Sequence, residues 1–282
     1  MNGASQGTHT LRAARAVGRT FDADSRLAED PELRTYVSDM VRPYGLAPRE
    51  DLLASGSGHT YGEMAEQLIG AAVAPHEPVD VLVLAFAVPD ARPGRTLAPY
   101  LSGLCPGRPV AFGLCDQGTA AAFTAVRIID AFRPSYPDGF RALLVVAEQS
   151  ALHHEPAARP APMPARHAAV AVLFEPCAAG GRIRQFTGVA PHAAAGLLDE
   201  QVAELAPRGG ELPLLLGPGI STLREPSGTG AGPDVGADQP YTGLWSRLAG
   251  LTARELAAGR AILADYDPVL GCLSLCTLEC AP

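Results

Sequence analysis

The stretch 109–123, PVAFGLCDQGTAAAF, joins an apolar run to an alanine-rich run through a short polar segment that begins near Cys115. The first run is typical of a strand buried on both faces, and the second is typical of a helix. A cysteine at the N-terminus of a buried helix feels the positive end of the helix dipole and free backbone N–H groups, which favour a thiolate and stabilise an oxyanion. The stretch therefore makes Cys115 a candidate nucleophile.

Composition narrows the classes of protein to which the chain can belong. The 282 residues are 47% hydrophobic and carry a net charge of −8, which indicates a large buried core in one large domain or two fused halves. No basic cluster is present, so we expect neither nucleic acid nor a membrane surface as a partner. All 22 basic residues are arginine, which excludes a Schiff-base lysine and the lysine of a phosphate-binding loop.

The cysteines are expected to be reduced thiols in a cytoplasmic protein, because they form no close CxxC pairs and no signal peptide or membrane-spanning run is recognisable. Three of them recur every four residues near the C-terminus, as metal ligands on a helix face would. Their segment, VLGCLSLCTLEC (269–280), alternates like a strand instead, so we expect buried thiols and no metal site. These three cysteines are Cys272, Cys276 and Cys280.

Strand and helix patterns alternate in the first half of the chain. A strand opens the chain at 9–21, and three apolar, valine- and leucine-rich segments further on predict buried parallel strands with helical crossovers. Two helix starts are marked, by Asp30 followed by proline and by a capping box of Thr60 and Glu63. The three apolar strands are 79–88, 109–114 and 141–148, and the helices are 30–41, 59–74, 96–104 and 117–132.

A Pro/Ala-rich connection, 155–166, precedes a second series of elements. This series begins with two antiparallel strands and ends with a hairpin whose turn lies near Asp267 and Pro268. Its elements resemble those of the first series, so we expect an internally duplicated chain with halves at 1–154 and 167–282. The expected elements are strands 167–176 and 182–190, helix 197–206, strand 212–219, loop 228–240, helix 242–259 and hairpin 260–280.

The segment LCDQGTAAAFTAVRIIDAF (114–132) resembles the nucleophile segment of the thiolase-fold condensing enzymes, especially ketoacyl synthase III and hydroxymethylglutaryl synthase. VDVLVLAFAVPD, ALLVVAEQSA and the closing hairpin resemble other strands of that family. The resemblance implies an α/β thiolase-like fold, in which two related halves pack as a layered α-β-α-β-α sandwich, here with a trimmed second half. It places Cys115 on the nucleophile and Gly118 and Thr119 at the helix start that forms the oxyanion site. An alignment anchored on the preceding strand puts Gly118 at the nucleophile position instead; the longer match, GTAAAFTAV, favours Cys115.

The rest of the family's catalytic triad is expected to be lost. The family carries a histidine in an HQAN-like turn and an asparagine in a GNTG-like turn, which activate the thiol and hold the thioester carbonyl. The matching turns here are LLLGPGIST (214–222) and PYTGLW (240–245). Neither glycine nor tyrosine can replace the missing groups with the same geometry. The residues at the two positions are Gly217 or Gly219, and Tyr241 or Thr242.

Other titratable residues could stand in for the missing base. His153 and His154 follow the strand 141–148 and are the candidates, although adjacent histidines in a proline-rich loop are usually surface residues. Glu148 ends that strand, and a structural hydrogen-bonding role is expected for it, with a pKa that burial can tune.

This combination resembles the small non-catalytic subunit of the heterodimeric synthase III-like enzyme of alkylquinolone biosynthesis. The closing hairpin of this chain, ADYDPVLGCLSLCTLEC (264–280), is similar to the hairpin that ends that subunit. The resemblance implies a degenerate subunit in secondary metabolism of polyketide or fatty-acyl type, paired with a larger catalytic homologue. The alternative is an acyltransferase or condensing enzyme in its own right, a homodimer that uses Cys115. No cofactor is expected beyond an acyl-CoA or acyl carrier protein thioester as substrate, and the carrier protein is a possible partner.

A third hypothesis lies outside this family. The glycine-rich segment GTGAGPDVG (228–236) looks like a dinucleotide-binding motif, but it follows no clear strand and carries Pro233 and Asp234 where a helix should begin. A loop without a cofactor is therefore the favoured interpretation.

Overall fold

One mixed sheet of eight strands organises the chain in the computed structural model, with the order β3-β2-β4-β5-β1-β8-β7-β6. The structure describes residues 4–21, 27, 30–92, 96–136, 139–155, 162–205, 212–224, 238–251 and 259–280. The strands are β1 (Ala4–Phe21), β2 (Val81–Ala85), β3 (Val110–Leu114), β4 (Ala142–Glu148), β5 (His167–Phe186), β6 (Leu214–Leu216), β7 (Arg260–Asp267) and β8 (Cys272–Cys280).

Strands β1 and β5 run through both halves of the molecule. They pair antiparallel from Ala4 opposite Phe186 to Phe21 opposite His167, with an irregularity where residues 177–180 oppose Thr10. At 18 and 20 residues, both are far longer than an ordinary strand. The prediction of two separate strands at 167–176 and 182–190 was therefore wrong, because the glycine-containing segment between them forms a bulge within one strand and not a hairpin turn.

The pairing pattern repeats in the second half. In the first half β2 pairs parallel with β4, β4 antiparallel with β5, and β5 antiparallel with β1. In the second half β6 pairs parallel with β7, β7 antiparallel with β8, and β8 antiparallel with the end of β5. Strand β3 extends the first half beyond β2, whereas no described strand lies beyond β6. The duplication and the trimmed second half are thus both visible in the sheet.

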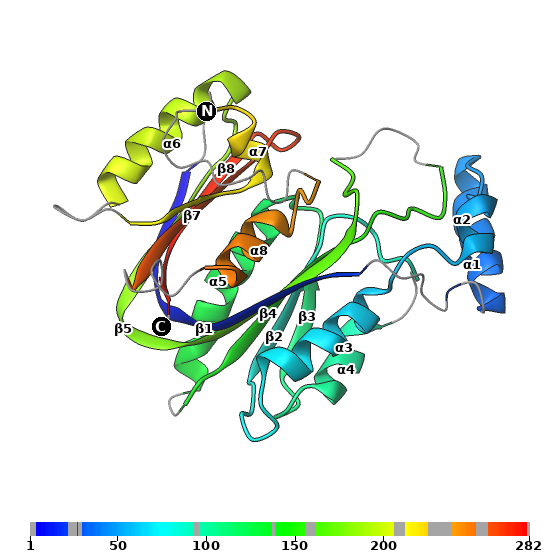
Figure 1. Ribbon diagram of the computed structural model, residues 1–282, viewed down its shortest axis with the longest axis horizontal. Coiled ribbons are helices and arrows are strands. Elements are labelled where there is room, and N and C mark those ends of the chain that lie inside the picture. The colour runs from blue at the N-terminus through cyan, green and yellow to red at the C-terminus, as the bar shows by residue number, and fades with distance from the viewer. Residues whose placement is uncertain are drawn as a thin grey trace.

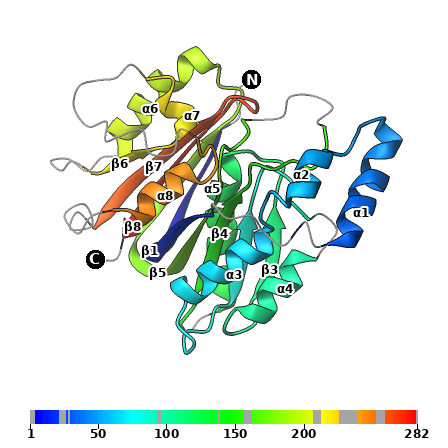
Figure 2. The same cartoon turned by 45° about the vertical axis from the view of Figure 1, so that its right-hand side comes forward.

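Helices cover both outer faces and separate the two halves (Figure 1). Helices α3 and α4 lie outside the first half, α6 and α7 lie outside the second, and α5 and α8 lie between them and contact strands of both halves. Figure 2 shows the same five layers from another side, which confirms the predicted α-β-α-β-α arrangement. The helices are α3 (Tyr61–Ala72), α4 (Leu97–Leu104), α5 (Ala120–Phe132), α6 (Pro191–Leu205), α7 (Pro218–Ser221) and α8 (Gly243–Ala249).

The predicted helix starts are correct. Asp30 caps α1 (Pro31–Val41) by accepting a hydrogen bond from the backbone N–H of Glu32, and Thr60 and Glu63 form the complete capping box of α3. A short helix, α2 (Glu50–Ser55), follows α1 at one side of the layers. Among the helices of the described residues, none combines the length and the apolar character needed to cross a membrane.

A buried aromatic contact joins the two helices of the central layer. Phe123 on α5 and Trp245 on α8 meet edge to face, with ring centroids 5.8 Å apart. The three cysteines of β8 are buried and free, as expected. This packing fixes the N-termini of α5 and α8 at the carboxyl edge of the parallel strands, where the catalytic residues of such a fold are expected.

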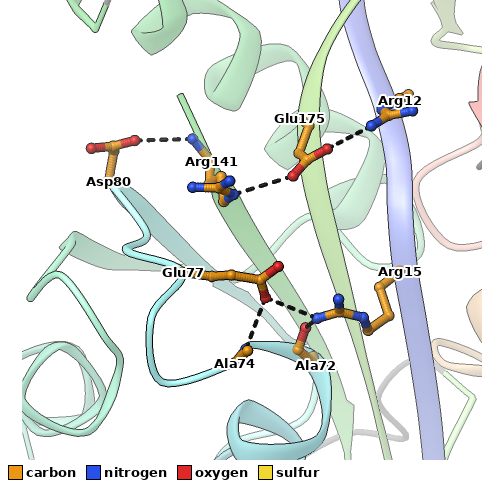
Figure 3. A network of polar contacts seen from close by, with 8 residues as sticks. All are labelled: Arg12, Arg15, Ala72, Ala74, Glu77, Asp80, Arg141 and Glu175. Carbon is orange, nitrogen blue, oxygen red and sulfur yellow. Dashed lines mark hydrogen bonds and ion pairs between the residues drawn. The ribbon is translucent and has the colours of Figure 1, made fainter. Parts of the chain in front are cut away.

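Ion pairs link the strands at the opposite end from the start of α5, where β2 and β4 begin (Figure 3). Glu175 on β5 accepts hydrogen bonds from Arg12 on β1 at 2.8 Å and from Arg141, just before β4, at 3.1 Å. Asp80, just before β2, accepts a hydrogen bond from the backbone N–H of Arg141. These contacts hold the strands together at the edge opposite to the candidate site.

Candidate functional site

The turn from β3 into α5 forms the centre of the candidate site. Two residues in this turn have left-handed backbone conformations, Asp116 with φ of 61° and Gly118 with φ of 50°. Glycine adopts this conformation without steric cost, and aspartate tolerates it better than most residues. Thr119 then precedes the first residue of α5, Ala120. The structure thus places Gly118 and Thr119 at the helix start, as predicted from the residues after Cys115.

Cys115 lies outside the helix start. It follows the last residue of β3 and is exposed, and its Sγ donates a hydrogen bond to Oδ2 of Asp116 at 3.2 Å. That hydrogen bond, together with partial burial and the charge of the same carboxylate, raises the pKa of the Cys115 thiol. A reactive thiolate needs a positive environment, so the surroundings of Cys115 oppose the activation that the sequence led us to expect.

The two candidate bases do not reach this thiol. His153 is buried, and its Nδ1 and Nε2 lie 3.0 Å from the carbonyl oxygen of Ala91 and 2.7 Å from that of Ser57. His154 pairs with Pro48 in an isolated bridge, and burial, followed by the charge of His153, lowers the pKa of its imidazole. Among the hydrogen bonds of the described residues, none joins either imidazole to Cys115. The structure therefore indicates that His153 stabilises the loops that contain Ala91 and Ser57.

The turn expected to carry a histidine packs against a buried carboxylate. Asp265 on β7 is fully enclosed, and its Oδ1 accepts hydrogen bonds from the backbone N–H groups of Ile220 and Tyr266. A Cβ atom on Gly217 would lie 2.6 Å from that Oδ1, and one on Gly219 would overlap the carbonyl oxygen of Tyr266. Gly217 therefore cannot accept a side chain while Asp265 stays in place, and Gly219 cannot accept one against the backbone of Tyr266. Burial raises the pKa of the Asp265 carboxyl to about 7.

The turn expected to carry an asparagine is held by Glu148. The backbone N–H of Tyr241 donates to Oε2 of Glu148 at 2.8 Å, and both the backbone N–H and the hydroxyl of Thr242 donate to the same carboxyl group. Burial raises the pKa of Glu148 to about 7. Glu148 therefore anchors the start of α8 to the end of β4, which is the structural hydrogen-bonding role that we expected.

Asp267, at the end of β7, closes the space in front of Gly118. Its Oδ2 accepts a hydrogen bond from the backbone N–H of Thr119 at 2.9 Å. A Cβ atom on Gly118 would overlap that Oδ2 and would lie 2.7 Å from Cγ of Asp267. A cavity of about 10 Å³ remains beside Gly118, Thr119 and Tyr241, and it has room for about one water molecule. The hydroxyls of Thr119 and Tyr241 are buried there without a hydrogen-bond partner in the described structure.

Sequence reasoning missed the importance of Asp265 and Asp267. The available signal was the pair of carboxylates two residues apart in an otherwise apolar strand, AILADYD (261–267), because such residues share one face of a strand. The glycine-rich segment 228–236 lies outside the described residues. Within those residues, the site combines glycines at positions 118 and 217 with two buried aspartates, and no hydrogen bond joins a thiol to an imidazole at the start of α5.

Comparison with known proteins gives no match to any family model and none to a curated protein sequence. Solved structures are similar, however. The acyltransferase ChlB3 has a TM-score of 0.62 at 14% identity, with 97% of this chain and 98% of that chain covered. The fold is thiolase-like. The 3-oxoacyl-(acyl carrier protein) synthase III FabH from Pseudomonas aeruginosa has a TM-score of 0.58 at 13% identity, covering 97% and 99% of the two chains. AbyA1, a tetronic acid condensing enzyme, has a TM-score of 0.57 at 18% identity, covering 96% and 100%.

These structures are all condensing enzymes or acyltransferases, in agreement with the fold expected from the resemblance of segment 114–132. At such low identity the similarity establishes the thiolase-like fold alone. The chemistry of this chain has to be argued from its own residues.

Proposed function

We propose that this chain is the non-catalytic subunit of a heteromeric ketoacyl synthase III-like enzyme, and that it supports a larger, catalytically complete homologue. In this proposal Gly118, and not Cys115, stands at the nucleophile position, because it directly precedes Thr119, the N-cap residue of α5. The observation that carries the proposal is the occupation of that position by the carboxylate of Asp267. The homologue would bind the acyl-CoA or acyl carrier protein thioester and form a product of polyketide or fatty-acyl type.

The edge of β3 supports the partner that we propose. β3 is the outermost strand of the first half, and all of its residues are at least partly exposed, whereas those of β2 and β4 are buried. Val110 on this edge is 50% exposed. An unpaired strand edge with apolar side chains is a template for pairing with another chain. We propose that the homologue adds its own strand to this edge.

Co-purification of two matched lysine variants tests this partner. Val110→Lys places a charge on the β3 edge, and charged edge residues prevent strand pairing. Val269→Lys places the same charge at a valine that is 64% exposed in the β7–β8 turn. With a catalytically complete ketoacyl synthase III homologue from the same source, we expect a one-to-one complex for the unmodified chain and for Val269→Lys, and at least a tenfold weaker complex for Val110→Lys. Equal binding by the two variants, or no complex with the unmodified chain, would contradict the proposal.

An independent acyltransferase is the second candidate, and one observation favours it. Cys115 is a free, exposed thiol at the carboxyl edge of the parallel strands, where a thioester could reach it. The two candidates differ in one observable, which is an acyl group on Cys115 after exposure to an acyl thioester.

A further inference from the structure

We infer that Asp267 is an internal plug that closes the nucleophile position of this chain to acyl thioesters. The inference rests on the proposed function, because it explains how a site without its nucleophile is filled. The plug is the carboxylate itself. It occupies the volume that a side chain at position 118 would need, and it accepts the hydrogen bond that the backbone N–H of Thr119 would otherwise donate to an incoming oxygen atom.

The carboxylate of Asp267 is held by three backbone donors. Oδ2 accepts from Thr119 at 2.9 Å, and Oδ1 accepts from Val269 at 3.0 Å and from Leu270 at 2.9 Å. The residue is only 1% exposed. A negative group at the N-terminus of the 13-residue helix α5 is also stabilised by the helix dipole. The plug is therefore fixed from both sides, by its own turn and by the helix that it caps.

Within the part of the chain that the structure describes, little space remains beside this position. The remaining cavity of about 10 Å³ is lined mainly by apolar side chains, and Tyr241, which is 5% exposed, closes it with an unpartnered hydroxyl. A space of that size admits about one water molecule and no acyl chain. An acyl group carried on a side chain at position 118 would overlap Asp267 unless that carboxylate moved away.

The same strand fills the second catalytic position in the same way. Asp265 lies two residues before Asp267 on one face of β7, and its carboxylate takes the space in front of Gly217. Each of the two glycines thus faces a buried aspartate of one strand. Two such pairs show that the glycine and the aspartate depend on each other sterically, so a side chain at 118 requires the loss of the side chain at 267.

A double-variant cycle tests this dependence. The variants are Gly118→Ala, Asp267→Gly and their combination, and Gly139→Ala is the control, because Gly139 has a similar φ of 70° and nothing within 4 Å of its Cβ direction. We expect Gly118→Ala to lower the melting temperature by about 5 °C more than Gly139→Ala, since a shift of 2–4 °C corresponds to about 1 kcal/mol in a chain of this size. The double variant should melt higher than the sum of the two single effects predicts. Additive effects, or equal melting temperatures of Gly118→Ala and Gly139→Ala, would overturn the plug.

Alkylation of an introduced cysteine gives a second measurement, which does not depend on the melting temperatures of the Gly118→Ala variants. In a Cys115→Ala background, Gly118→Cys and Gly118→Cys/Asp267→Gly are treated with iodoacetamide, and the modified peptide is quantified by mass spectrometry. We expect position 118 to react at least tenfold faster in the double variant, because the carboxylate is gone and the helix start is open. Equal rates, or a double variant that fails to fold while both single variants fold, would overturn the plug.

Neither readout involves acyl transfer, so failure of the plug and failure of the proposed function are distinguishable. If the unmodified chain accepted an acyl group on Cys115 while the cycle showed coupling, the plug would stand and the non-catalytic function would fall. If the chain accepted no acyl group and the cycle was additive, the function would stand and the plug would fall.

Discussion

A glycine at position 118 satisfies two separate requirements of the structure. Its φ of 50° lies in the left-handed region, where a side chain costs about 1–2 kcal/mol. Its missing Cβ also leaves room for the Asp267 carboxylate. The backbone conformation and the neighbouring carboxylate thus both favour glycine at position 118. The same reasoning applies to Gly217 beside Asp265, without the backbone requirement.

His153 provides a prediction about a single residue. Its imidazole lies between the carbonyl oxygen of Ala91, in the loop after β2, and that of Ser57, in the loop before α3. His153→Ala removes the ring N–H that one of these two enclosed carbonyl oxygens accepts, and we expect a loss of about 1–3 kcal/mol in the free energy of unfolding. Urea denaturation measures the change. His192→Ala is the control, because His192 is exposed on α6 and its removal should change stability by less than about 0.5 kcal/mol.

The outcome also separates the structural role of His153 from a catalytic one. A variant as stable as the unmodified chain would contradict the bridging role. If His153 were instead the base of an active thiol, His153→Ala would abolish acyl labelling of Cys115 and leave the unfolding midpoint unchanged.

Two buried carboxyl groups, one on β7 and one on β4, have strongly raised pKa values. Burial raises the pKa of Asp265 to about 7, and Glu148 on β4 has a pKa raised to about 7 for the same reason. In each case the folded protein holds a proton that the unfolded chain releases near pH 4. The folded state therefore binds more protons between about pH 4 and pH 7, so the free energy of unfolding falls as the pH rises through this window.

Asp265→Asn tests this sign. The variant removes one titrating group and keeps a side-chain oxygen as acceptor for Ile220 and Tyr266. We expect urea unfolding between pH 5 and pH 7.5 to show a slope reduced by up to about 1.4 kcal/mol per pH unit in the variant. Asp199→Asn, at an exposed position of α6, is the control and should keep the original slope. An unchanged slope in Asp265→Asn would show that Asp265 is ionised in the folded protein at pH 5.

Local patterns predicted most elements well. The proline after Asp30, the capping box at Thr60 and the apolar runs that became β2, β3 and β4 encode short-range preferences that the fold preserves. The closing hairpin was also predictable from alternation and from its turn near Asp267. Strand β5 was not, because a bulge containing glycine and a turn containing glycine have the same local sequence signal.

The content of the candidate site could be predicted only in part. The absence of the family's histidine could be predicted, since Gly217 and Gly219 lie in the recognisable turn where that histidine is expected. The carboxylate that lies against Gly118 could not be predicted, because this contact joins Gly118 to Asp267, 149 positions further along the chain. The position of Cys115 was ambiguous for a related reason: only two residues separate it from Gly118, and only the backbone shows that α5 begins at Ala120, closer to Gly118 than to Cys115.

The molecule as a whole combines five packed layers with a sheet that ends at strand β3. The five layers bury α5 and α8 between the two halves, and the strands are tied at the far edge by the Arg12, Arg141 and Glu175 cluster. The outer strand β3 remains open on one side within the described residues. The open edge of β3 and the contact of Asp267 with the residues before α5 are the two features on which the proposed supporting subunit rests.

Intact-protein mass spectrometry of the purified chain with acyl-CoA thioesters distinguishes the two proposed functions. Acetyl-CoA, malonyl-CoA and octanoyl-CoA are incubated with the unmodified chain, with Cys115→Ala and with an active ketoacyl synthase III as positive control. We expect the positive control to gain one acyl group, and the unmodified chain to keep its mass with every thioester, because its helix start holds Asp267 in place of a nucleophile. A stoichiometric acyl adduct on the unmodified chain that is absent from Cys115→Ala would contradict the non-catalytic function.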